Sequence, residues 1–144
     1  FSIDNEFMAE IEKIIYSEIE QYRTRFEKDK EGFLVKWPID YHLHGWLISM
    51  NNGGKLSPHI HDTGWISGTI YINVPPKNVP SEGNLVVSIG EKQDEASKRK
   101  NKEETIDVFT GDLVLFPASL THFTIPFQSD ERRIVLAFDV VPGK

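Results

Sequence analysis

The chain has 144 residues, of which 39% are hydrophobic and 26% charged, which is ordinary for one globular domain with a buried core. Sixteen basic against 22 acidic residues give a formal net charge of −6, the wrong sign for a protein that binds nucleic acid through its phosphates. The sequence has no cysteine, which excludes disulfides, thiolate metal sites and cysteine nucleophiles, and no apolar run is long enough to span a bilayer.

Domain organisation and location follow from the same features. We expect a single domain over residues 1–144, with small molecules rather than nucleic acid or a membrane as partners. The first residues lack the basic, apolar and small-residue order of a secretion signal. Together with the lack of cysteine, this predicts a cytoplasmic location.

An N-terminal helix is predicted over about residues 3–30. Apolar side chains recur every three or four residues from Ile3 to Phe26, so they form one stripe along a helix. Asp4 is a suitable N-cap, and Gly32 ends the pattern. We expect the apolar stripe to pack against a sheet.

From residue 33 to about 142 the sequence changes to short β-prone segments separated by turn residues. Strands are expected at 33–37, 41–50, 56–61, 66–74, 84–89, 105–109, 112–116, 122–127 and 133–141. The polar segment 90–104 has no periodicity and is predicted to be a surface loop that could serve as a lid. One helix followed by many short strands predicts a mainly β fold, either a sandwich or a barrel-like jelly roll.

Two separate segments carry histidines that could form one metal site. His59 and His61 are two residues apart on an expected strand, so both side chains point to the same face. His122 follows another β-prone segment far along the chain. An open site with neutral nitrogen ligands suits Fe(II) and, less selectively, Zn, Cu or Ni. The spacing alone also fits histidines that are half-buried or face solvent.

A second His-x-His pair, His42 and His44, lies in the strand expected at 41–50. Trp46 and Ile48 share its face by alternation. We interpret this pair as part of an ordinary strand surface rather than as metal ligands.

Several motifs in one order resemble a known family. They are SPHIHDTGWISGTIYINVP at 57–75, EGNL at 82–85, LVLFP at 113–117, His122, PF at 126–127, RI at 133–134 and AFDVVP at 137–142. The segment from about Trp46 to Pro142 is similar to the 2-oxoglutarate-Fe(II) oxygenases often found at the C-terminal end of tetratricopeptide-repeat proteins. The resemblance implies a double-stranded β-helix (jelly roll, cupin-like), with the N-terminal helix packed on it and a core over about residues 33–142.

The resemblance also implies one Fe(II) ion, which 2-oxoglutarate chelates through its 1-carboxylate and 2-keto oxygen. The metal ligands carried over by position are His59, His61 and His122. The wider oxygenase class uses two histidines and one carboxylate, and Asp62 lies one position away from that pattern. Asp62 is therefore an alternative ligand, provided that a local bulge turns it inward.

For the cosubstrate, the resemblance points to Arg133, because a guanidinium can donate two parallel hydrogen bonds to the far carboxylate of 2-oxoglutarate. Alternation sends the adjacent Arg132 to the other face. Tyr71 could donate a hydrogen bond to 2-oxoglutarate, or it could be a core aromatic. Trp65 could form a wall of the substrate pocket, or it could simply pack. Val135 stands where the wider class often has Ser or Thr.

The function expected from this resemblance is a non-haem Fe(II), 2-oxoglutarate-dependent dioxygenase that hydroxylates a substrate and releases succinate and CO2. One alternative is a cupin-like three-histidine metalloenzyme that does not use 2-oxoglutarate and has no need of Arg133. Another is a non-catalytic β-helix that serves as a binding module.

Overall fold

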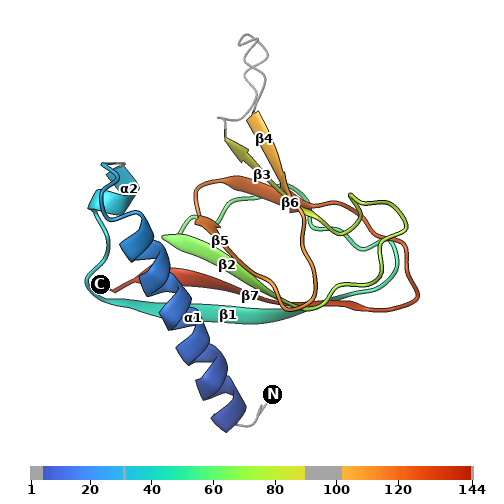
Figure 1. Ribbon diagram of the computed structural model, residues 1–144, viewed down its shortest axis with the longest axis horizontal. Coiled ribbons are helices and arrows are strands. Elements are labelled where there is room, and N and C mark those ends of the chain that lie inside the picture. The colour runs from blue at the N-terminus through green and yellow to red at the C-terminus, as the bar shows by residue number, and fades with distance from the viewer. Residues whose placement is uncertain (1–4, 31, 90–101, 144) are drawn as a thin grey trace. The chain divides into compact units, whose positions relative to one another are not determined.

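The computed structural model describes residues 5–30, 32–89 and 102–143 (Figure 1). The chain forms two compact units, Phe1–Ile39 and Asp40–Lys144. The expected N-cap Asp4 and residues 90–101 of the expected surface loop lie outside the described residues. The single domain over residues 1–144, with its helix packed on the strands, stays a prediction.

The first unit contains the predicted N-terminal helix, α1, at Asn5–Arg25. Glu6 lies in its first turn and Arg23 and Arg25 in its last, where each charge opposes the helix dipole. In the apolar stripe, Ile15 and Ile19 are buried. Among the described helices, none is both long and apolar enough to cross a membrane.

The strand expected at 33–37 is absent: the chain forms a short helix there, α2, at Gly32–Val35. Only five residues separate Gly32 from Pro38, and so short an apolar run does not distinguish a strand from a helical turn.

The second unit consists of strands. They are β1 (Tyr41–Met50), β2 (Ile66–Asn73), β3 (Leu85–Ile89), β4 (Lys102–Ile106), β5 (Leu113–Pro117), β6 (Thr121–Thr124) and β7 (Arg133–Pro142). They form two antiparallel sheets, with strand orders β1-β7-β2-β5 and β4-β3-β6. Both sheets place early strands beside late ones (Figure 1), and this confirms the predicted mainly β jelly roll.

Besides 33–37, two expected strands differ most from the structure, and the one expected at 122–127 is shorter, as β6 ends at Thr124. Segment 56–61 forms only an isolated bridge, in which His59 pairs with His122, because Pro58 has no N–H to donate to a longer ladder. The strand expected at 105–109 begins earlier, as β4 at Lys102–Ile106. Its burial pattern is almost entirely exposed, so no apolar alternation marks it in the sequence.

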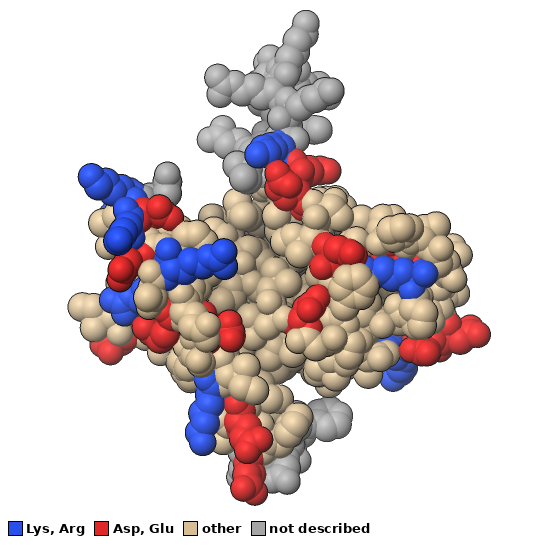
Figure 2. All heavy atoms as spheres, viewed as in Figure 1, with Lys and Arg blue, Asp and Glu red and all other residues tan. Residues whose placement is uncertain are grey.

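A hydrophobic core occupies the second unit. Its buried members are Tyr71, Leu85, Val87, Val108, Phe116 and Val135. They come from β2, β3, β5, β7 and the chain after β4, so this core joins both sheets. On the face shown in Figure 2, acidic and basic side chains are interspersed rather than gathered into a patch of one sign.

Candidate functional site

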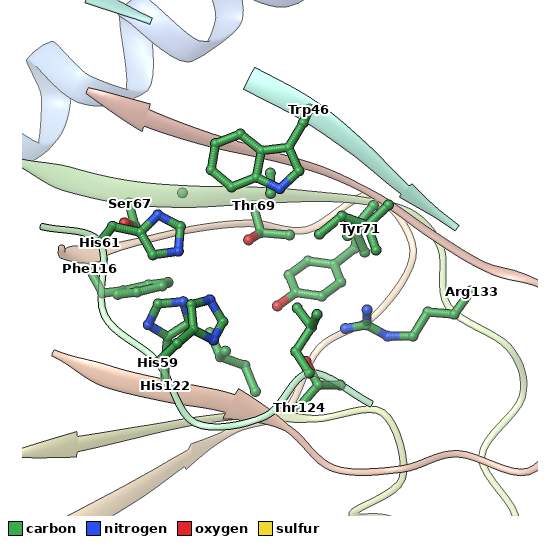
Figure 3. A pocket seen from close by; sticks show the side chains of 16 residues that line it. Trp46, His59, His61, Ser67, Thr69, Tyr71, Phe116, His122, Thr124 and Arg133 are labelled. Carbon is green, nitrogen blue, oxygen red and sulfur yellow. The ribbon is translucent and has the colours of Figure 1, made fainter. Parts of the chain in front are cut away.

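The three histidines singled out in the sequence converge on one point (Figure 3). Potential ligand atoms of His59, His61 and His122 all lie within 4.8 Å of one another. Backbone pairing sets this geometry: the N–H of His59 donates to the carbonyl of His122 at 3.1 Å, and the reverse bond is 3.0 Å. The N–H of His61 donates to the carbonyl of Ala118 at 3.1 Å. The local pairing thus brings the imidazoles of two distant segments together.

Each of these imidazoles has an oxygen acceptor at its Nδ1 atom. The acceptors are Ser57 O for His59 at 2.7 Å, the Asp139 carboxylate for His61 at 2.8 and 2.7 Å, and Leu120 O for His122 at 3.0 Å. Carbonyl and carboxylate oxygens only accept, so Nδ1 carries a proton in every ring, and in the neutral form of each ring Nε2 keeps a lone pair. Three lone pairs in one small volume form a suitable site for a divalent cation.

The protonation state of His122 also favours metal binding. Its side chain is buried, and burial lowers the pKa of His122 to about 4, with a smaller contribution from the nearby His59 and His61. The imidazole is therefore neutral at physiological pH, the form that coordinates a metal.

The histidines line one cavity of about 100 Å³ that also contains Arg133 and Tyr71. Figure 3 shows Arg133 on the other side of Tyr71 from the three imidazoles. Arg133 is only 2% exposed, and its guanidinium carbon lies 5.3 Å from the centre of the Tyr71 ring. The first residue of β7 thus contributes a buried cation to the same cavity as the histidines.

Arg133 has few partners for a buried charge. Its Nη2 donates to the carbonyl of Gly83 at 3.2 Å, and a side-chain hydrogen bond links its guanidinium to Tyr71, while its Nε has no hydrogen-bond partner. Within the described ranges, no Asp or Glu forms an ion pair with it. Burial lowers the pKa of Arg133 from its usual value, but an arginine side chain stays charged in proteins. Such a group is costly unless an anion joins it.

Tyr71 lies between the histidines and Arg133. Its side chain is 1% exposed, and burial raises the pKa of Tyr71 to about 12 despite the opposing effect of the Arg133 charge. The phenol therefore stays protonated and can donate a hydrogen bond into the cavity.

Other candidates from the sequence lie outside the cavity. Asp62 is exposed and is not part of the group of three ligands. His42 and His44 are exposed on β1, as expected. Trp65 does not line the cavity, which has Trp46 in its wall instead.

Two residues of the site escaped sequence reasoning. The Trp46 ring stacks on His61, with ring centres 5.5 Å apart. The sequence feature that pointed to it is the alternation of Trp46 with Ile48, which puts both side chains on the same face of the strand. Asp139 binds His61 from β7. Only its place in the motif AFDVVP pointed to it, and no spacing rule links it to His61.

The comparisons with known proteins agree with this geometry. The family described as "Putative 2OG-Fe(II) oxygenase" matches residues 44–139. Among curated proteins, none matches the chain.

Several solved structures have a similar fold. A Pseudomonas putida prolyl-4-hydroxylase is 17% identical with a TM-score of 0.56, and the match covers 88% of this chain and 63% of that one. HygX from Streptomyces hygroscopicus, solved with nickel, 2-oxoglutarate and hygromycin B bound, is 15% identical with a TM-score of 0.54, covering 83% and 64%. This chain therefore spans less than two thirds of the length of either protein.

Proposed function

Because the chain belongs to the 2-oxoglutarate-Fe(II) oxygenase family, we propose that it is a non-haem Fe(II), 2-oxoglutarate-dependent dioxygenase that hydroxylates its substrate and releases succinate and CO2. One observation carries the proposal: the cavity that holds three convergent histidines also holds the buried Arg133, for which no carboxylate partner exists among the described residues. The cytoplasmic location expected from the sequence stays a prediction.

The histidines fit the metal that the family implies. His59, His61 and His122 would hold Fe(II) through three neutral nitrogens, which leaves positions open for the cosubstrate and O2. Asp62 is exposed and has no part in this ligand set. The chemistry supplied by the bound metal would be O2 activation coupled to the oxidative decarboxylation of 2-oxoglutarate to succinate and CO2, with one oxygen atom going to succinate and the other to a C–H bond of the substrate.

The opposite side of the cavity fits the cosubstrate. Arg133 would bind the far carboxylate of 2-oxoglutarate through charge-assisted hydrogen bonds, which would supply an anion that no described residue provides. The Tyr71 hydroxyl would donate to the same ligand. Apolar side chains around them, Ile48, Leu85 and Val135, exclude water and so strengthen both interactions.

Trp46 is the better candidate for a substrate contact than Trp65. Its ring is half-buried, lines the cavity and stacks on His61. We place the substrate beside it, where a flat apolar surface adjoins the proposed metal.

The three histidines alone would equally suit a cupin-like metalloenzyme that does not use 2-oxoglutarate. Arg133 distinguishes the two functions, because that enzyme would have no use for an unpaired cation in its cavity. A non-catalytic binding module would have no use for either feature.

Two measurements test the proposal. The first is calorimetric titration of Ni(II)-loaded protein with 2-oxoglutarate, in which Arg133→Ala should weaken binding by about 30-fold or more, since removing one partner of a buried charge pair costs at least about 2 kcal/mol. The second is succinate release in the presence of Fe(II), ascorbate and 2-oxoglutarate, which the wild type should show and His122→Ala should lose.

Matched variants serve as controls. Arg132→Ala removes the exposed neighbouring guanidinium and should leave 2-oxoglutarate binding unchanged. Asp62→Ala should leave metal binding unchanged. A wild type that binds Ni(II) but not 2-oxoglutarate would exclude the dioxygenase and favour the cupin-like enzyme.

A further inference from the structure

The three proposed ligands differ in what holds them. His59 and His122 donate from Nδ1 to backbone carbonyls two residues before them, Ser57 and Leu120. His61 instead donates to the side chain of Asp139, which is 78 residues away on β7. His61 is therefore the only one of the three whose acceptor carries a negative charge.

Asp139 is held firmly in a buried position. It is 5% exposed, and Ser67, itself 2% exposed, donates from its hydroxyl to Asp139 Oδ1 at 2.7 Å. The two residues face each other across β2 and β7. A Cβ atom at Gly64 would lie 3.2 Å from Asp139 Cγ, so the glycine leaves room for the carboxylate.

Among the described residues, the carboxylate of Asp139 has His61 as its one basic partner. In the parts of the chain that the structure describes, no Lys or Arg forms an ion pair with it, and its only ion-pair contact is His61. A buried carboxylate is costly without a cation. With His61 neutral, a metal ion on the opposite nitrogen of the same imidazole would balance this charge.

We propose that Asp139, oriented by Ser67, is a positioning residue that gives this three-histidine site the single negative charge that a carboxylate ligand gives the two-histidine, one-carboxylate sites. This inference rests on the proposed metal site. Asp139 fixes His61 with Nε2 unprotonated and makes that nitrogen a stronger donor to the metal. The charge that Asp62 would have contributed by direct ligation is thus supplied through His61.

Two consequences separate this role from simple packing. Loss of the carboxylate charge weakens metal binding even where a hydrogen-bond acceptor remains, because partners of ligating histidines are worth about 10–100-fold in metal affinity. It also raises the Fe(III)/Fe(II) midpoint potential, since a nearby negative charge favours the more highly charged ion.

The test compares Asp139→Asn, which keeps an oxygen acceptor but removes the charge, with Ser67→Ala and with Asp130→Asn. Asp130 is exposed, so its variant changes the net charge equally but away from the cavity. Metal-free proteins are titrated with Co(II) by calorimetry, and the midpoint potential is measured on iron-loaded protein without 2-oxoglutarate.

We expect Asp139→Asn to raise the Co(II) dissociation constant by about 10–100-fold and to raise the midpoint potential. Ser67→Ala should weaken binding less, because the carboxylate keeps its charge, and Asp130→Asn should match the wild type. Circular dichroism checks that each variant folds. If Asp139→Asn does not fold, Ser67→Ala provides the test: weaker Co(II) binding than in the wild type supports the inference, and unchanged binding overturns it.

Two results for Asp139→Asn would overturn the inference and leave the proposed function intact. One is a Co(II) affinity and a midpoint potential equal to those of the wild type. The other is a weakened Co(II) affinity with an unchanged midpoint potential. Failure of the wild type itself to bind Co(II) would instead remove the proposed function.

Discussion

Arg133 places a positive charge in a cavity where the surrounding protein provides few hydrogen-bond partners for it. Among the described residues, its guanidinium donates to the carbonyl of Gly83 and hydrogen-bonds to Tyr71, over whose ring it lies. Burying a charge with so few partners costs free energy in the ligand-free protein. A bound carboxylate would offset this free-energy cost. The same residue therefore lowers the stability of the ligand-free protein and raises its affinity for an anion.

This trade-off predicts the effect of Arg133→Met on stability. Methionine fills a similar volume without a charge to desolvate, so the free energy of unfolding of the metal-free protein should rise by about 1–3 kcal/mol. Urea denaturation measures the change. Arg132→Met, at an exposed position, should stay within about 0.5 kcal/mol of the wild type. A loss of stability in Arg133→Met would show that Gly83 and Tyr71 already compensate the charge.

At the scale of elements, β7 carries two residues of the site, Arg133 and Asp139, on its inward face. Between them Phe138 points to the opposite face and pairs with Gly68 on β2 and with Gly45 on β1. A Cβ atom at Gly68 would lie 2.5 Å from Cε2 of the Phe138 ring and closer still to Cζ. The ring thus covers Gly68, and this contact holds β7 against β2.

The two glycines should therefore respond differently to alanine. Gly68→Ala drives a methyl group into the Phe138 ring and should lower the free energy of unfolding by about 1–3 kcal/mol. At Gly45 the nearest atom to an added Cβ is Ala137 O at 3.4 Å, an ordinary contact. Gly45→Ala should be neutral or stabilise by up to about 1 kcal/mol, because glycine weakens a strand.

Urea denaturation of the two variants provides the measurement. Equal destabilisation by both would mean that strand flexibility, rather than the Phe138 contact, makes glycine necessary at these positions.

At the scale of the second unit, the proposed metal would join its two sheets. His122 belongs to β6 of the three-stranded sheet, whereas His61 is bound through Asp139 to β7 of the four-stranded sheet. Unfolding separates these strands and disperses the ligands. Metal binding and folding are therefore linked.

Metal should consequently raise the melting temperature. At a metal concentration 100 times the dissociation constant the stabilisation is about 2.7 kcal/mol, which corresponds to about 5–10 °C for a chain of this size. Scanning fluorimetry with Ni(II) measures the shift, and EDTA should reverse it. His122→Ala should show no shift. A full shift in that variant would place the metal somewhere other than at the three histidines.

Local patterns predict much of the second unit. The expected strand at 41–50 coincides with β1, and the expected strand at 133–141 differs from β7 by one residue. Both are ten residues long, enough for alternation to show. The failures, at 33–37 and 56–61, are short runs, one followed by Pro38 and the other interrupted by Pro58, in which alternation carries little information.

The amino-acid pattern pointed to the three histidines and to a mainly β fold, and the resemblance to the oxygenase family added Arg133 and Tyr71 as candidates and implied the jelly roll. Residue types and alternation are local properties, and they say which face of a strand each side chain occupies. The pairing of β7 with β1 and β2 placed Asp139 beside His61 and Ser67, and the packing around Arg133 brought no carboxylate of the described residues to its charge. Those neighbours come from strands far apart in the chain, so the register of the folded sheets had to decide them.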